Sequence, residues 1–316
     1  MADEIEIRPY QDSDLEAVLD TMRAALGEPP GLGRTPHLFA WKHLDNPFGK
    51  SLMLVADAAG EIAGFRAFMR WEMLTPAGET LRCVRAVDTA AHPDFQRRGI
   101  FKNLTLAGIE AATEDGVDMI FNTPNEKSGA GYLKMGWLSV GPIGIMARPG
   151  LGLASPKSDW KTVPALDAPS AIDSELADLF SKGTRHGLRT PRHLDYLRWR
   201  FGAHPTGQYA VATAEDGAAI ARLNRRSDRR ELVLSELVGI GAPRAARALI
   251  KQLRPAYAAG WFSEGTDERA LAMKAGLVPV PKVSALTLVA RPLRDLPLDV
   301  SDPSNWHIGL GDLELL

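Results

Sequence analysis

The sequence lacks several features that would point to a membrane, secreted or nucleic-acid-binding protein. Its single cysteine, Cys83, cannot form a disulfide within the chain. No run of about 18 apolar residues is free of charge, proline or clustered glycine, so no segment is recognisable as a membrane span. The 37 basic and 39 acidic residues nearly balance, which argues against a nucleic-acid or membrane partner. The start MADEIEIRPY does not resemble a secretory signal, and we expect a cytoplasmic protein.

The length of the chain is sufficient for two domains. At roughly 150 residues per domain, 316 residues with 45% hydrophobic content can build two cores. Proline, glycine and serine are frequent around residues 149–165, where no steady periodicity is present. We therefore expect a first domain at 1–148, a linker at 149–165 and a second domain at 166–316.

Hydrophobic periodicity in the first half predicts a mixed α/β fold. Residues 5–9 alternate like a strand, and residues 15–26 have the spacing of an amphipathic helix. The run SLMLVADAAGEIAGFRAFMRW, with a turn at Ala59-Gly60, and the run LRCVRAVDTA predict an antiparallel meander. A helix in IFKNLTLAGIEAATEDG, a strand in DMIFNTP and a short helix in SGAGYLKMGW follow. The pattern predicts a mixed, largely antiparallel sheet flanked by helices.

The second half repeats features of the first at matching spacing, which indicates a tandem duplication. The offset between the copies shortens midway, so the second copy lacks part of the intervening segment. Each copy then closes with an Ala-Arg-Pro triplet. The recurring residues are Trp41 and Pro47 with Trp199 and Pro205, Phe121, Lys134 and Gly136 with Trp261, Lys274 and Gly276, and the triplet arginines Arg148 and Arg291.

The segment VRAVDTAAHPDFQRRGIFKNL has the features of an anion site. A strand that turns directly into a helix exposes backbone N–H groups at the positive end of the helix dipole, and such a place binds phosphate. Gly99 allows close approach of an anion, and Arg97 and Arg98 add positive charge. The alternative interpretation is an ordinary loop with solvated arginines.

The segment FNTPNEKSGAGYLKMGW contains a second candidate group. Asn125 is placed to cap a helix, Tyr132 follows seven residues later, and Gly136 ends the helix. On its own the signal is weak, because a tyrosine in a short amphipathic helix is more often a packed core residue.

Together and in this order, the two segments resemble the Gcn5-related N-acetyltransferase (GNAT) superfamily. Residues 96–99 fit its first signature, whereas Phe101 departs from it at a position that is usually small. Asn125, Tyr132, and the glycine and aromatic at 136–137 fit its later motif. The resemblance covers residues 4–148 and, in degenerate form, residues 160–292, where Ala272 stands in place of the tyrosine. It implies two GNAT-like domains, of which the first is competent.

The resemblance implies a site for acetyl-CoA and no metal. The strand at residues 85–91 should separate from its neighbour at a bulge, with the pantetheine arm of the cofactor in the gap. Tyr132 would protonate the departing thiolate, and Asp88, or in its place His92, would take the proton from the amine. Asp88 is also explained by a structural role at the end of the strand. The implied cofactor-binding residues are Thr89, Ala91, Gln96, Arg97, Arg98, Gly99, Ile100 and Asn125.

The implied function is acetyl-CoA-dependent N-acyl transfer to an amine by direct attack in a ternary complex. Two alternatives remain open: a non-catalytic acyl-CoA sensor, which would need no Tyr132, and an aminoacyl transferase of related two-domain build, which would need a basic groove. A small-molecule amine is the expected partner, and a homodimer is left open. The sequence does not identify the amine.

Overall fold

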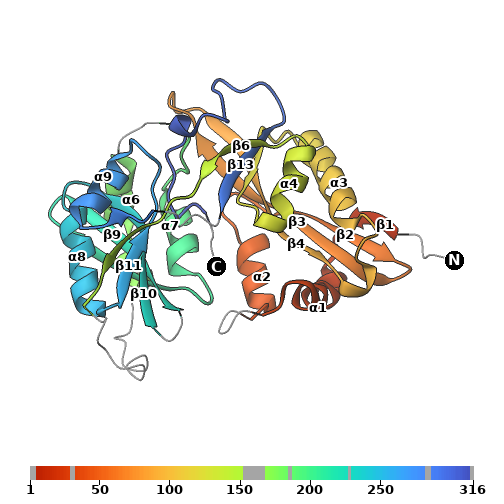
Figure 1. The fold of residues 1–316 in the computed structure, drawn as a ribbon, viewed down its shortest axis with the longest axis horizontal. Helices are drawn as coiled ribbons and strands as arrows, with labels where there is room; N and C mark the ends of the chain where they lie inside the picture. The colour runs from red at the N-terminus through yellow and green to blue at the C-terminus, as the bar shows by residue number, and fades with distance from the viewer. Residues whose placement is uncertain are drawn as a thin grey trace. The chain divides into compact units, whose positions relative to one another are not determined.

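The computed structural model describes residues 5–28, 33–151, 168–183, 187–226, 229–281 and 286–313 (Figure 1). The chain divides into two compact units, each built from segments of both halves of the sequence. The first unit comprises Met1–Met73, Thr80–Ser139 and Leu288–Ser301, and the second comprises Leu74–Glu79, Val140–Thr287 and Asp302–Leu316. Most of the expected linker, residues 149–165, lies outside the described residues.

The first unit contains a seven-stranded sheet in the order β1-β2-β3-β4-β5-β13-β6. The pairs β1–β2, β2–β3 and β5–β13 are antiparallel, whereas β4 and β5 are parallel. The strands are β1 (Ile5–Pro9), β2 (Leu52–Ala58), β3 (Glu61–Leu74), β4 (Thr80–Ala91), β5 (Met119–Asn122), β6 (Leu138–Pro142) and β13 (Thr287–Pro292). The mixed sheet confirms the predicted fold class.

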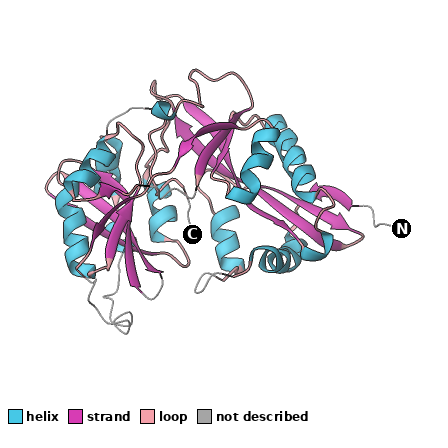
Figure 2. Ribbon diagram, in the orientation of Figure 1, coloured by secondary structure: helices cyan, strands magenta, loops and turns pink. Residues whose placement is uncertain are grey.

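Helices cover both faces of this sheet, because successive side chains of a strand point to opposite faces (Figure 2). On β3, Phe65 and Ala67 pack in the cluster that includes the α1 residues Val18 and Leu19. Phe68, on the other face, packs with residues of α3 and α4. The helices are α1 (Leu15–Leu26), α2 (Pro36–His43), α3 (Ile100–Glu114) and α4 (Glu126–Lys134).

The second unit contains a six-stranded sheet in the order β12-β7-β11-β10-β9-β8. Helix α8 is strongly amphipathic and buries its apolar face, including Leu249 and Leu253, against this sheet. The strands are β7 (Met146–Pro149), β8 (Gln208–Ala214), β9 (Gly217–Arg226), β10 (Arg229–Val238), β11 (Tyr257–Gly260) and β12 (Val278–Pro279). The helices are α5 (Ala168–Ala171), α6 (Ser174–Ser181), α7 (Leu194–Leu197), α8 (Ala242–Leu253) and α9 (Asp267–Lys274).

The two sheets exchange one strand each. Strand β13, from the end of the second copy, lies between β5 and β6, and β7, from the end of the first copy, lies between β11 and β12. Each Ala-Arg-Pro triplet thus ends its own copy in the sequence but lies in the sheet of the other copy. Both strands end with this triplet, so sequence order alone does not choose between the two pairings.

Equivalent contacts in the two copies confirm the duplication. The side chain of Thr35 caps α2, and the side chain of His193 caps α7 in the same way. Arg291 donates to the carbonyl of Met135, one residue before Gly136, and Arg148 donates to the carbonyl of Ala275, one residue before Gly276. The exchanged arginines thus make the same bond at the end of α4 and of α9.

Candidate functional site

The parallel pairing of β4 and β5 ends before β4 does, and we call the edge of β4 that has no strand partner among the described residues the gap. The pairing runs from Cys83–Met119 to Arg85–Phe121, but β4 continues to Ala91. Asp88 has a φ of 46°, in the left-handed region that a non-glycine residue occupies only when its surroundings enforce it. This kink comes directly before Thr89. Backbone groups of β4 beyond the kink are therefore placed beside the gap rather than against β5.

The segment between β4 and α3 forms a small pocket at the start of the helix. Gly99 is the N-cap of α3 with a φ of 77°, and Arg97 also has a left-handed φ, of 65°. This backbone leaves the first N–H groups of a 15-residue helix without helical partners, at the positive end of its dipole. The pocket has a volume of about 290 Å³ and is lined by Ala91, Phe95, Gln96, Arg97, Gly99, Ile100, Phe101 and Lys102.

Five of the predicted cofactor residues meet at this pocket, and Ala91 links it to the gap in the sheet. Arg98 does not line it. Its guanidinium lies 5.0 Å from the ring centre of Phe95. The geometry is that of an anion site continuous with a gap between strands.

Tyr132 lies on α4 and is 3% exposed. Its hydroxyl oxygen accepts a hydrogen bond of 2.8 Å from Nη1 of Arg66, and its ring packs edge-on against Phe101, at 5.5 Å between centres. The large Phe101 is accommodated by Gly131, where a Cβ would lie 3.2 Å from the Phe101 ring. The departure from the motif at position 101 is thus matched by a glycine on the facing helix.

Asn125 acts as a helix cap. Its side-chain oxygen accepts hydrogen bonds from the backbone N–H of Ser128, at 3.0 Å, and from the Ser128 hydroxyl, at 3.1 Å. These contacts explain the asparagine in this position without a cofactor. Its role in cofactor binding stays a prediction.

Asp88 is surrounded by positive charge. Its carboxylate lies 2.8 Å from Nζ of Lys42 and 3.0 Å from Nε2 of His43, with Arg34 at 3.8 Å. Burial raises the pKa of Asp88, but Lys42 and His43 outweigh it and hold the pKa well below its usual range. A carboxylate with so low a pKa is a weak base at neutral pH, so these contacts favour a role in fixing the kink of β4.

Arg66 was not predicted from the sequence, and it joins two of the predicted residues. It lies on β3, is fully buried, and donates from Nη1 to the hydroxyls of both Thr89 and Tyr132. The signal was present, since an arginine interrupts the apolar run IAGFRAFMRW. Lys42 and His43 were also missed, because their spacing to Asp88 is set by tertiary contact.

The second unit fills the corresponding gap with its own chain. Strand β10 pairs with β11 only as far as Leu234–Gly260. Beyond that point Gly309 bridges to Phe262, and the backbone of Leu310 donates to Trp261 at 3.1 Å. On the other side, a Cβ on Gly311 would lie 2.8 Å from the carbonyl oxygen of Ser235. Residues 308–311 thus occupy the space between β10 and the chain that follows β11.

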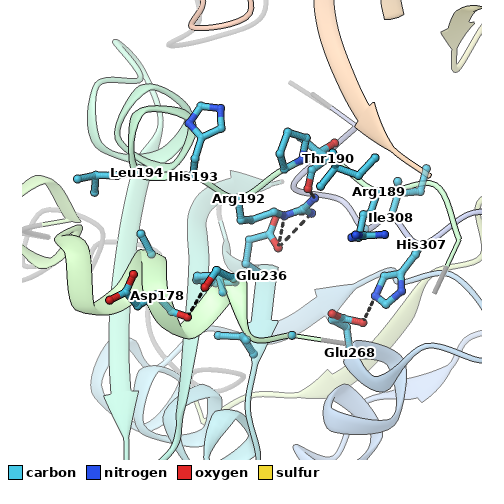
Figure 3. A pocket seen from close by; sticks show the side chains of 18 of the residues that line it. Asp178, Arg189, Thr190, Arg192, His193, Leu194, Glu236, Glu268, His307 and Ile308 are labelled. Carbon is cyan, nitrogen blue, oxygen red and sulfur yellow. Dashed lines mark hydrogen bonds and ion pairs between the residues drawn. The ribbon is translucent and has the colours of Figure 1, made fainter. Parts of the chain in front are cut away.

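A larger pocket of about 630 Å³ lies in the second unit, beside this inserted segment (Figure 3). Arg192 bridges two carboxylates there, at 2.9 Å from Glu236 and 2.8 Å from Asp312. Nε2 of His307 lies 2.6 Å from the Glu268 carboxylate. The predicted site residues all lie in the first unit.

Residues 6–139 match the model of a family described as an acetyltransferase (GNAT) domain. This part of the chain thus matches the GNAT acetyltransferase domain that its motifs predicted. A comparison with curated protein sequences found no match. Within the described residues, no helix has both the length and the apolar character needed to cross a membrane.

Solved structures of GNAT proteins resemble the whole chain. A GCN5-related N-acetyltransferase from Anabaena variabilis is 12% identical with a TM-score of 0.63, and the match covers 92% of this chain and 73% of that protein's chain. Eis1 from Mycobacterium abscessus is 16% identical with a TM-score of 0.56, covering 92% and 74%. A tandem GNAT protein from the clavulanic acid biosynthesis pathway is 15% identical with a TM-score of 0.54, covering 93% and 100%. At these identities the likeness shows a shared fold.

Proposed function

We propose that the chain is an acetyl-CoA-dependent N-acyltransferase with its active site in the first unit. The observation that carries the proposal is the continuity of two features: the gap beside β4 and the pocket at the start of α3 share Ala91. A linear cofactor with an anionic end fits such an arrangement, because the chain can lie along the strand while the phosphates meet the helix N-terminus.

The residues suit the two parts of the cofactor differently. Backbone N–H groups at residues 99–102 and the Arg97 side chain would hold the pyrophosphate. The pantetheine arm would pair with β4 at Thr89 and Ala91, beyond the kink at Asp88. The thioester would then lie between β4 and Tyr132.

Tyr132 supplies the proton in the proposed reaction. The amine nitrogen bonds to the acetyl carbon, a backbone N–H of β4 holds the oxyanion, and the C–S bond breaks with its electron pair on sulfur. The phenolic proton passes to the thiolate, and the proton that the nitrogen loses returns to the tyrosine through water. Asp88 as the base stays a prediction that its ion pairs disfavour.

The second unit is proposed to be non-catalytic. Its gap is filled by residues 308–311, and Ala272 replaces the tyrosine. The acceptor itself is proposed to be a small-molecule amine. The alternative function, aminoacyl transfer from a tRNA-linked donor, would need a broad basic groove, and the nearly balanced charge of the chain argues against it.

A CoA-release assay over a panel of amines tests the proposal. We expect turnover with at least one amine class, formation of its acetyl amide, and loss of turnover in Tyr132→Phe. Acetyl-CoA binding without turnover on any amine, in a chain that also binds when Tyr132 is replaced, would support the sensor instead. Absence of acetyl-CoA binding would overturn the proposal.

A further inference from the structure

Arg66 is a cation buried inside the first unit. The residue is 0% exposed, and among the described residues no carboxylate pairs with it. Its Nε and Nη2 atoms likewise have no hydrogen-bond partner within the part of the chain that the structure describes. The rings of Phe68, Tyr132 and Phe101 lie 4.8, 5.3 and 5.8 Å from its guanidinium carbon and stabilise the charge only in part. A buried charge held at this cost is typical of a functional site.

A buried arginine of the second unit, Arg200, has a structural role and serves as a comparison for Arg66. Arg200 also donates to a buried tyrosine, Tyr209, at 2.9 Å. Its Nε atom, however, donates to the carbonyl of Gly311 at 3.0 Å and so ties the inserted segment in place. Within the described part of the chain, Arg66 anchors no backbone carbonyl in this way. Its hydrogen bonds go to the hydroxyls of Thr89 and Tyr132.

The hydrogen bond to Tyr132 fixes the direction of the tyrosine's own proton. A guanidinium has only donors, so the phenolic oxygen must accept from Arg66, and its hydrogen is turned toward another acceptor. A sulfur atom that receives this proton lies about 3 Å from the oxygen. It is therefore within roughly 6 Å of the positive charge of Arg66.

We propose that Arg66 is a positioning residue for the leaving thiolate. It holds the Tyr132 hydroxyl with its proton toward the sulfur, and its charge stabilises the anion as the C–S bond breaks. The electron pair stays on sulfur, the phenolic proton moves to it, and the phenolate left beside the guanidinium regains the proton lost by the amine. This inference rests on the proposed function.

The test is the pKa of the CoA thiol in the complex, followed by the ultraviolet absorbance of the thiolate. A CoA thioether, which cannot titrate, serves as the spectral blank. A positive charge at this distance should lower the thiol pKa by about 1 to 3 from its usual value of ~8.5. Arg66→Met should return it to about 8.5, and Arg66→Lys should keep part of the effect. Arg200→Met is the matched control and should leave the thiol unchanged.

The outcomes separate the inference from the proposed function. If CoA fails to bind the wild-type chain, the proposed function is overturned and the inference with it. If CoA binds but its thiol titrates normally, or if the lowered pKa persists in Arg66→Met, only the inference is overturned. Arg66→Met should fold, because its removal strands no partner carboxylate.

A double-mutant cycle adds a kinetic readout. If Arg66 acts through the hydroxyl, Arg66→Met should lower turnover at least tenfold in the wild-type background and much less in Tyr132→Phe. Equal losses in both backgrounds would overturn the positioning role. Unchanged amine KM in Arg66→Met is expected, since the residue is placed beside the sulfur.

Discussion

The two units share a fold but differ at the end of their central parallel strand pair: the second unit fills this place with its own chain, and the first, within the described residues, does not. In the first unit the pairing of β4 with β5 ends at Arg85, and Asp88, further along β4, has a left-handed φ of 46°. In the second unit residues 308–311 enter the equivalent space, where they bond to Trp261 and Ser263 on one side and lie close to Ser235 on the other. The comparison teaches that the GNAT fold by itself does not make a cofactor site. The gap must also be left open and carry chemical groups.

The largest effect should come from deleting the Tyr132 hydroxyl, with the equivalent deletion at Tyr209 in the second unit as the comparison. Tyr132 and Tyr209 are both 3% exposed, and each accepts a bond from a buried arginine, at 2.8 and 2.9 Å. Tyr132→Phe should lower turnover about 10²- to 10⁴-fold with little change in acetyl-CoA affinity, because this hydroxyl is the proposed proton donor to the thiolate.

Tyr209→Phe is the control. It should cost about 1 kcal/mol of stability through the lost hydrogen bond and leave turnover intact. Steady-state kinetics and acetyl-CoA titration measure both variants. Full activity in Tyr132→Phe would reduce this tyrosine to a packed core residue, and equal losses in the two variants would remove the distinction between the units.

A charge placed at the anion pocket should abolish acetyl-CoA binding. Gly99→Glu brings a carboxylate to the proposed pyrophosphate site and strains a backbone with a φ of 77°. Gly265→Glu, at a φ of 75° in the second unit, imposes similar strain away from the pocket. At 100 times the dissociation constant, acetyl-CoA should stabilise the wild type and Gly265→Glu by about 2.7 kcal/mol, and Gly99→Glu not at all. A thermal shift retained in Gly99→Glu would place the cofactor elsewhere.

The buried carboxylates of the two units should respond differently to pH. Burial raises the pKa of Glu236 from 4.5 to about 7, although Arg192 opposes it. Between these values the folded chain binds more protons than the unfolded chain, so the free energy of unfolding should fall as pH rises, by at most about 1.4 kcal/mol per pH unit. Asp88 behaves differently, because its pKa is lowered on folding. Its ionised carboxylate stabilises the fold at every pH above the ordinary aspartate pKa of about 3.9, so it adds no pH dependence to the free energy of unfolding between pH 5 and 7.

Urea unfolding at pH 5, 6 and 7 measures this difference. Glu236→Gln should flatten the decline, whereas Asp115→Asn, the same change at a first-unit carboxylate whose pKa Arg70 lowers, should leave its slope unaltered. An identical slope in wild type and Glu236→Gln would contradict the assignment of the raised pKa to this residue.

The last prediction is the absence of binding: the second unit should bind no acetyl-CoA. Its gap is filled and it has Ala272 where a tyrosine is needed. Calorimetry should give one site per chain in the wild type and no site in Gly99→Glu. Two sites per chain would show that the inserted segment is displaced by the cofactor.

Local patterns predicted the elements of the first unit well. The helix expected at residues 15–26 is α1, the turn at Ala59-Gly60 joins β2 to β3, and Gly99 begins α3. Each of these depends on residues near in sequence, such as apolar spacing and a glycine with positive φ. The exchange of β7 and β13 could not be predicted in this way, because it is a choice between two similar partners far apart in the chain.

For the site, the sequence determined the short-range chemistry: the QRRG turn before a helix, and a tyrosine at fixed spacing from a cap. The tertiary structure decided which groups surround them. Only the folded sheet brings Arg66 of β3 to Thr89 and Tyr132, and only α2 brings Lys42 and His43 to Asp88. Likewise, the filling of the second gap depends on where residues 308–311 pack. Local motifs are set by neighbouring residues, whereas the charge around them is set by contacts between distant strands, which no spacing in the sequence records.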